Sequence, residues 1–140
     1  MTSESSIPEP PNVFIYNKDT TKDAIPRHAT HVKVDPSVKG IHDYAFQDCL
    51  SLVEVEFSEG LQVIGIEAFW NCKNLKQIHK LPSTLKEIGE DAFRNCKSLD
   101  SIEFPEGLQE IGISAFACCC ELKRIKIPSA NVVIERRAFA

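Results

Sequence analysis

The sequence predicts a β-rich solenoid of about five 23-residue coils with parallel strands. Three observations support this prediction. The pair Ala-Phe recurs at residues 45–46, 68–69, 92–93, 115–116 and 138–139. Cys, Leu and then Val or Ile follow the first four phenylalanines at distances of three, six and nine residues. A second apolar pair closes each unit. Self-similarity at a period of about 20 to 50 residues is typical of solenoids and related repeat folds.

The repeat has a simple physical reason. One 23-residue coil cannot bury its own apolar side chains, whereas stacked coils bury them as continuous columns. The pattern therefore predicts that Phe46, Phe69, Phe93 and Phe116 lie in one file. A second file of small, buried cysteines is expected from Cys49, Cys72, Cys96 and Cys119.

Each unit contains one alternating segment that predicts a strand. In the clearest one, Val55 and Phe57 are expected to point inward while Glu54 and Glu56 point outward. Proline follows the corresponding segment in three later units, where no ladder donor is required. One unit has 24 residues, and its extra residue lies between Ile78 and Leu85.

The complete pattern is A-F-x-x-C-x-x-L-x-x-I-x-(F/I)-P-x-x-L-x-x-I-G, and it resembles the BspA-type leucine-rich repeat over residues 32–140. The resemblance implies parallel strands on one face, with short strands or turns on the other. It also implies binding or adhesion by surface presentation, with no catalytic residues. Departures from the pattern are Lys80 with the inserted residue, the stretch 129–131, and three consecutive cysteines.

The ends of the chain depart from the repeat. Residues 1–11 are expected to form a disordered tail, and residues 12–28 an N-terminal capping segment with a strand over 13–16. The solenoid is expected over 29–140, with its C-terminal end uncapped. An uncapped end indicates either a fragment of a longer array or an open strand edge that supports a homodimer through the C-terminal coil.

Composition limits the classes of partner and compartment. The net charge is -4 and the pI about 5.6, which argues against nucleic-acid binding. No apolar run is long enough for membrane insertion. The N-terminus lacks the features of a secretory signal, so the sequence predicts a cytoplasmic or nuclear protein with reduced cysteines. A cell-surface location is the expectation if the sequence is a fragment.

The outward positions of the predicted strands are the candidate partner-binding residues: His31, Lys33, Glu54, Glu56, Gln77, His79, Ser101, Glu103, Arg124 and Lys126. The alternative interpretation is cross-strand charge pairing, of Lys33 with Glu56 and of Glu103 with Lys126, which would contribute about 0.2–1 kcal/mol per pair. Arg124 is the best single anchor, because arginine is enriched at interface hot spots.

Trp70 is a further partner-binding candidate. It follows the phenylalanine of its unit, a place that Gln47, Arg94 and Ala117 occupy elsewhere. It either anchors a partner or lies over side chains of a neighbouring coil.

Other chemistry has little support in the sequence. Cys118 and Cys120 flank a column cysteine and are candidates for oxidation if exposed. Three consecutive cysteines cannot converge on one metal ion, and zinc sites generally need two separated pairs. Neither a catalytic triad nor a phosphate-binding loop can be assembled, so no enzyme activity, cofactor or metal is expected.

Two hypotheses of function follow. The first is a non-catalytic interaction module that presents its strand face to another protein or to a surface glycan. The second is a structural segment of a longer scaffolding or adhesive array with no binding site of its own.

Overall fold

The structure is a computed structural model and describes residues 12–128 and 131–140; the predicted tail at 1–11 lies outside these residues. One short 3-10 helix, η2 (Lys22–Ala24), accompanies eleven described strands. The strands are β1 (Val13–Tyr16), β2 (His31–Val34), β3 (Gly40–Ile41), β4 (Glu54–Glu56), β5 (Val63–Ile64), β6 (Gln77–Ile78), β7 (Glu87–Ile88), β8 (Ser101–Glu103), β9 (Glu110–Ile111), β10 (Arg124–Lys126) and β11 (Val133–Ile134).

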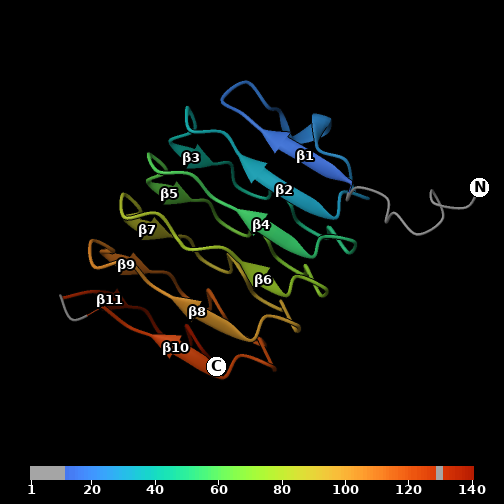
Figure 1. Cartoon of the computed structure of the whole chain (residues 1–140). Coiled ribbons are helices and arrows are strands. Elements are labelled where there is room, and N and C mark those ends of the chain that lie inside the picture. The colour runs from blue at the N-terminus through green and yellow to red at the C-terminus, as the bar shows by residue number, and fades with distance from the viewer. Residues whose placement is uncertain (1–11, 129–130) are drawn as a thin grey trace, which may run out of the picture.

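The chain winds into a parallel β-solenoid of about four turns (Figure 1). The longer strands β1, β2, β4 and β6 form one sheet, and β8 pairs with β10 in a second. The short strands β3, β5, β7, β9 and β11 form a continuous five-stranded sheet. Every strand pair is parallel and joins consecutive coils, so the predicted solenoid is confirmed.

The register places equivalent residues of successive coils opposite one another. Val32 pairs with Val55, and Val55 with Ile78. The predicted phenylalanine file is confirmed: the ring centroids of Phe46, Phe69, Phe93 and Phe116 follow one another at 5.1 Å, with interplanar angles of 9°, 3° and 7°. These rings are almost completely buried, so the file forms the centre of the core.

The cysteine file is also confirmed, and it carries a repeated polar contact. The Sγ atoms of Cys72, Cys96 and Cys119 donate to phenylalanine carbonyl oxygens of the preceding coil at 3.1–3.2 Å. Burial raises the pKa of each column thiol, to about 12 for Cys119. The column cysteines are therefore neutral, small core residues.

The remaining side of each coil, here called the third side, comprises residues 42–48, 65–71, 89–95 and 112–118. Left-handed backbone recurs there at non-glycine residues, for example Glu67 (φ 52°) and Asn71 (φ 64°). Alternate backbone N–H groups on this side donate to carbonyls of the next coil; that of Phe69 reaches the Ala92 oxygen at 2.7 Å. The third side therefore holds the coils together without a regular strand.

A short polar ladder runs along the third side. Asn71 Nδ2 donates to Asp48 Oδ1 at 2.6 Å, and Asn95 Nδ2 donates to Asn71 Oδ1 at 2.5 Å. These residues have positive φ, which asparagine and aspartate tolerate better than most residues. Their amides bond to one another along the solenoid, and Cys118 occupies the next place in this row.

The glycines at 65, 89 and 112 allow consecutive coils to approach closely. A Cβ atom on Gly89 would lie 2.8 Å from the carbonyl carbon of Gly65, and one on Gly112 would lie 2.7 Å from that of Gly89. Neither glycine has a positive φ. Space between the coils, and not backbone conformation, requires glycine at these positions.

The longer sheet is interrupted where the 24-residue unit inserts its extra residue. Within the described residues, β6 and β8 are not paired, although the short-strand sheet is continuous across the same coils. The insertion falls at residues 79–81, between β6 and the following corner. The two groups of longer strands thus meet at a seam with no ladder.

The two ends of the solenoid differ. At the N-terminal end β1 pairs with β2, and Tyr16 is buried with its hydroxyl accepting the His42 backbone N–H at 3.0 Å. At the C-terminal end of the described chain, Ile125, Ile127 and Val133 are exposed.

Candidate interaction surface

The structure brings the outward side chains of the longer strands onto one surface, here called the strand face. The register pairs His31 with Glu54, and Glu54 with Gln77. It also pairs Ser101 with Arg124 beyond the seam. Most of these side chains are exposed, and His31, Glu54 and His79 are partly buried. Every strand position proposed from the sequence lies on this face, namely His31, Lys33, Glu54, Glu56, Gln77, His79, Ser101, Glu103, Arg124 and Lys126.

Strand β1 extends the strand face with two apolar residues that the sequence reasoning did not include. Val13 and Ile15 pair in register with His31 and Lys33, and they are 40% and 49% exposed. The alternation in Val13–Tyr16 is the sequence signal for this arrangement, since Val13 and Ile15 share one side of the strand. The strand face therefore begins with an exposed apolar pair on an edge strand.

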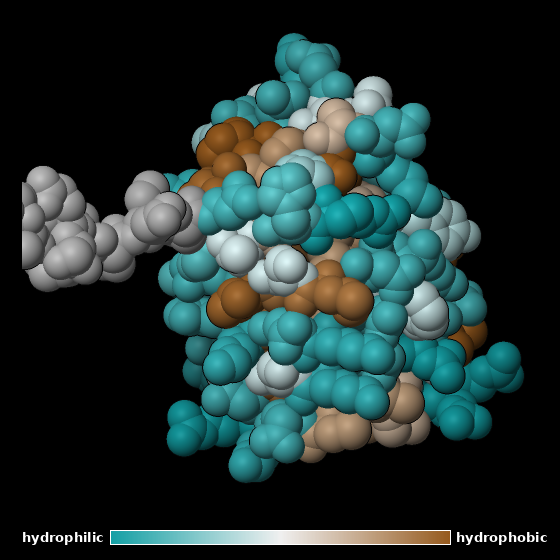
Figure 2. All heavy atoms as spheres, turned by 90° about the vertical axis from the view of Figure 1, so that its right-hand side faces the viewer, coloured by the Kyte–Doolittle hydropathy of each residue, from teal (hydrophilic) through white to brown (hydrophobic). Residues whose placement is uncertain are grey.

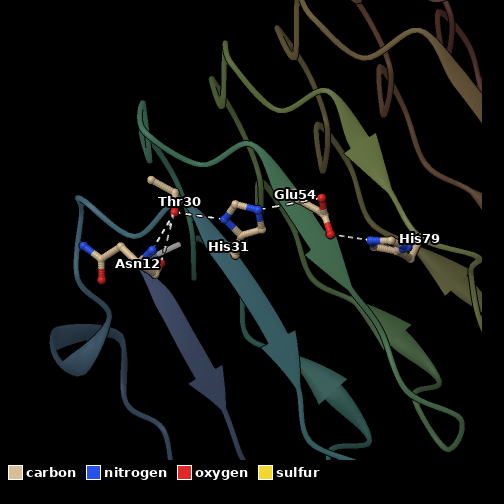
Figure 3. A network of polar contacts seen from close by, with 5 residues as sticks. All are labelled: Asn12, Thr30, His31, Glu54 and His79. Atoms are coloured by element: carbon tan, nitrogen blue, oxygen red, sulfur yellow. Dashed lines mark hydrogen bonds and ion pairs between the residues drawn. The ribbon is translucent and has the colours of Figure 1, made fainter. Parts of the chain in front are cut away.

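Glu54 is the centre of a polar network on the strand face (Figure 3). His79 Nε2 lies 2.5 Å from Glu54 Oε2, and His31 Nε2 lies 3.7 Å from Glu54 Oε1. His31 Nδ1 in turn contacts Thr30 Oγ1 at 2.9 Å, and Thr30 Oγ1 accepts the backbone N–H of Asn12 at 3.0 Å. One chain of contacts thus crosses the four strands from β1 to β6.

The two predicted cross-strand charge pairs have different outcomes. Lys126 Nζ lies 3.4 Å from Glu103 Oε2, and both side chains are more than half exposed. Lys33 and Glu56 are opposite in register, but no ion pair joins them among the described residues. The carboxylate of β4 that finds partners is Glu54, because His31 stands beside it on β2 and His79 directly follows β6.

The seam forms a shallow groove within the strand face. Its volume is about 290 Å³, and it is lined by residues 78–81 on one side and 101–103 on the other. Ile78 is only partly buried there, whereas its register partner Val55 is fully buried. The inserted residue therefore divides the strand face into a larger N-terminal and a smaller C-terminal part.

Trp70 lies away from the strand face, on the third side. It is partly exposed and lines an open groove of about 490 Å³ together with Glu67, Asp91, Arg94, Asn95 and Cys118. Two of the groove's side chains are tied locally, because Arg94 Nη1 lies 3.3 Å from Asp91 Oδ1. The structure therefore separates Trp70 from the other candidate residues and gives it a polar surrounding.

Figure 2 shows the side of the solenoid that faces right in Figure 1. Hydrophilic side chains cover most of this side, and hydrophobic ones gather toward the end where β1 lies and in a narrow band at mid-height. Scattered apolar residues are normal on protein surfaces. This side therefore offers no broad apolar surface to a partner.

The cysteines divide into a buried and an exposed set. Cys118 and Cys120 are exposed, whereas Cys119 is partly buried in the column. All six are free thiols. Within residues 12–128 and 131–140, no group of three or more His, Cys, Asp or Glu residues is arranged to hold a metal ion.

The chain belongs to the family described as the BspA type leucine rich repeat region, whose model matches residues 27–140 with six copies. No curated protein is similar enough in sequence to count as a match. Proteins of this family and fold are generally non-enzymatic, and leucine-rich repeats generally mediate interactions between proteins.

Solved structures of other leucine-rich repeat proteins resemble the chain. The leucine rich repeat protein of T. pallidum is 31% identical, with a TM-score of 0.75 over 91% of this chain and 59% of that one. A leucine rich cell surface protein from Faecalibacterium prausnitzii is 31% identical, with a TM-score of 0.70 over 79% of this chain and 30% of that one. A leucine-rich repeat protein from Bacteroides ovatus is 29% identical, with a TM-score of 0.54 over 70% of this chain and 33% of that one.

The predicted cytoplasmic or nuclear location is wrong. The F. prausnitzii relative is a cell surface protein, which contradicts an intracellular location as the main expectation. The prediction rested on the first residues of the chain, but the chain spans less than two thirds of each of these three proteins. Where the sequence begins therefore gives no information on the compartment. In the part of the chain that is described, no helix is apolar and long enough to cross a bilayer.

Proposed function

We propose that the chain is a non-catalytic interaction module that binds another protein through its strand face. The single observation that supports this most directly is the parallel register, which places exposed side chains of successive strands side by side. Parallel strands lie about 4.8 Å apart, so a partner that lies across several strands meets a dense row of side chains. Repeat solenoids commonly bind through such extended surfaces.

The composition of the strand face favours a protein over a glycan as its partner. Its N-terminal part combines the apolar pair Val13 and Ile15 with acidic Glu54 and Glu56. Its C-terminal part presents Arg124 and Lys126. Protein interfaces generally combine apolar contacts with polar and charged ones. The surface location of the F. prausnitzii relative supports presentation of this face outside the cell.

A second candidate function is a structural segment of a longer array. The observation in its favour is that several strand-face charges already have partners within the chain, namely Glu54 with two histidines and Glu103 with Lys126. Charges that are paired in this way are less available to a partner. This alternative predicts that the strand face tolerates charge reversal.

Capture from protein extracts with matched variants separates the two functions. The test variant is Arg124→Glu/Lys126→Glu on the strand face. The control is Lys39→Glu/Lys97→Glu, which makes the same charge change at two exposed lysines outside this face. We expect partners of the wild-type chain to be lost with the first variant and kept with the second. Equal capture by wild type and both variants would exclude the C-terminal part of the strand face.

The homodimer through the C-terminal coil stays a prediction. Strands β10 and β11 are the last of their sheets, and Ile125, Val133 and Ile134 are exposed beside them. A strand edge of this kind can pair with a second copy. Sedimentation at several protein concentrations checks it, and the prediction fails if the chain stays monomeric at the highest concentration.

A further inference from the structure

We propose that the groove around Trp70 on the third side binds a neutral β-(1→4)-linked glycan, with one pyranose ring stacked on the indole. Trp70 is the only tryptophan of the chain and is partly exposed. The same place in the neighbouring coils holds Gln47 and Arg94. One aromatic platform is thus flanked along the solenoid by polar side chains.

The polar rim of the groove is preorganised by contacts within the chain. Glu67 Oε2 accepts from Gln47 Nε2 at 2.6 Å, and Asp91 Oδ1 lies 3.3 Å from Arg94 Nη1. Each carboxylate is therefore fixed in place through one of its own two oxygens. Groups that are already fixed bind a ligand without a further loss of side-chain freedom.

Acceptor atoms remain at the rim for hydroxyl groups. The hydrogen bonds among the described residues occupy Glu67 Oε2, Asp91 Oδ1 and Asn95 Nδ2, and leave the second oxygen of each carboxylate and Asn95 Oδ1 without a partner. The asparagine ladder stops at Asn95 because the next residue in its row is Cys118, which is exposed. Ionised carboxylates accept strong hydrogen bonds from hydroxyl donors.

These features match a saccharide better than a peptide or an anion. A β-linked hexopyranose presents a face of C–H groups, which suits an aromatic ring, and a rim of hydroxyls, which suits fixed carboxylates. An aromatic platform with a few placed polar groups is the usual composition of a small-ligand site. Two carboxylates and one arginine line the groove, so its charge disfavours a polyanionic chain.

The spacing of the coils supports an extended chain along the solenoid axis. Successive phenylalanine rings repeat at 5.1 Å, which is comparable to the length of one pyranose ring. A glycan that runs along this axis therefore advances by one sugar for each coil. With one ring on Trp70, its neighbours lie over the places of Gln47 and Arg94.

The test uses the emission of Trp70, which reports on the site alone because no other tryptophan contributes. Cellohexaose and N-acetylchitohexaose are the probes, and a hexamer of galacturonic acid is the acidic comparison. We expect a saturable change in emission with at least one neutral hexaose, with a dissociation constant of about 1 mM. No change with either neutral probe, or tighter binding of the acidic one, would overturn the proposal.

Calorimetry with variants then tests the role of the indole. We expect Trp70→Ala to weaken binding about tenfold and Trp70→Phe to weaken it less. Tyr44→Ala is the matched control, because Tyr44 is another exposed aromatic on the third side and lies under Lys22. Equal affinity of Trp70→Ala and wild type would also refute the proposal. The strand-face variant Arg124→Glu/Lys126→Glu should bind the hexaose normally, so this site and the proposed protein interface are tested separately.

Discussion

Gly89→Ala should destabilise the solenoid strongly, although alanine is normally the better residue in regular structure. A Cβ atom at this position would meet only backbone: Gly65 C at 2.8 Å and Ile66 N at 2.9 Å. Ordinary contacts begin at 3.4 Å, so the two coils would have to separate by about half an ångström. Backbone on both sides cannot move aside as a flexible side chain can.

The magnitude of this effect follows from two contributions. Overpacking of a close-packed interior costs about 1–3 kcal/mol. Separation of the coils also lengthens the hydrogen bond from the Gly89 N–H to the Ile64 oxygen, now 2.8 Å, and a weakened bond costs about 1 kcal/mol. The opposing gain from a less flexible unfolded chain is about 0.4–1 kcal/mol. The net loss in the free energy of unfolding should be about 2–3 kcal/mol.

Urea denaturation of Gly89→Ala and Gly40→Ala tests this reasoning directly. Gly40 begins the short strand β3, whereas Gly89 directly follows the short strand β7. A Cβ atom on Gly40 would meet its nearest neighbour at an ordinary 3.7 Å. Both substitutions reduce the freedom of the unfolded chain equally, so Gly40→Ala should be neutral or stabilise by about 0.4–1 kcal/mol. Equal midpoints for the two variants would show that the coils adapt, and the argument from close approach would fail.

Three further outcomes are expected. Phe93→Ala removes a ring stacked between two others at 5.1 Å and should lower the free energy of unfolding by about 3–5 kcal/mol in chemical denaturation; a loss below about 1 kcal/mol would contradict a packed file. With Ellman's reagent, Cys118 and Cys120 should react in the native protein and the four column thiols only after unfolding, because burial raises the pKa of each column thiol. A hydrogen bond to Glu135 raises the pKa of the Glu110 carboxyl in the folded chain above its ordinary 4.5. The protonated carboxyl therefore stabilises the fold at low pH, and this contribution is lost as the pH rises through the raised pKa. Glu110→Gln should therefore stabilise the protein by a few tenths of a kcal/mol at pH 7, and should give no gain below pH 4.5. Melting curves that show the same gain at both pH values would refute this.

The fold could be predicted because the same physical requirement is written into every unit. A phenylalanine at each 23- or 24-residue step has only one way to be buried in a stack of identical coils, and the ring file at 5.1 Å is the result. The inward positions Val55 and Leu61 follow from the same periodicity, and both are fully buried.

Features that depend on contacts between particular neighbours could not be predicted in this way. The extra residue of the 24-residue unit was visible, but its effect on β6 and β8 depends on where the backbone absorbs it. The pairing of Glu54 with His79, and not of Glu56 with Lys33, depends on side-chain reach within one row. Left-handed backbone at Tyr44 and Glu67 has no sequence signal, because these residue types do not favour positive φ.

The seam between β6 and β8 bears on how the molecule comes apart. In a linear array each coil is stabilised only by its two neighbours, so the weakest interface determines where cooperativity ends. At this interface the longer sheet contributes no ladder, so the backbone hydrogen bonds between the two halves come from the short strands and the third side. Under a pulling force or in native-state hydrogen exchange, the coils after β7 should open as one block while those up to β7 remain closed.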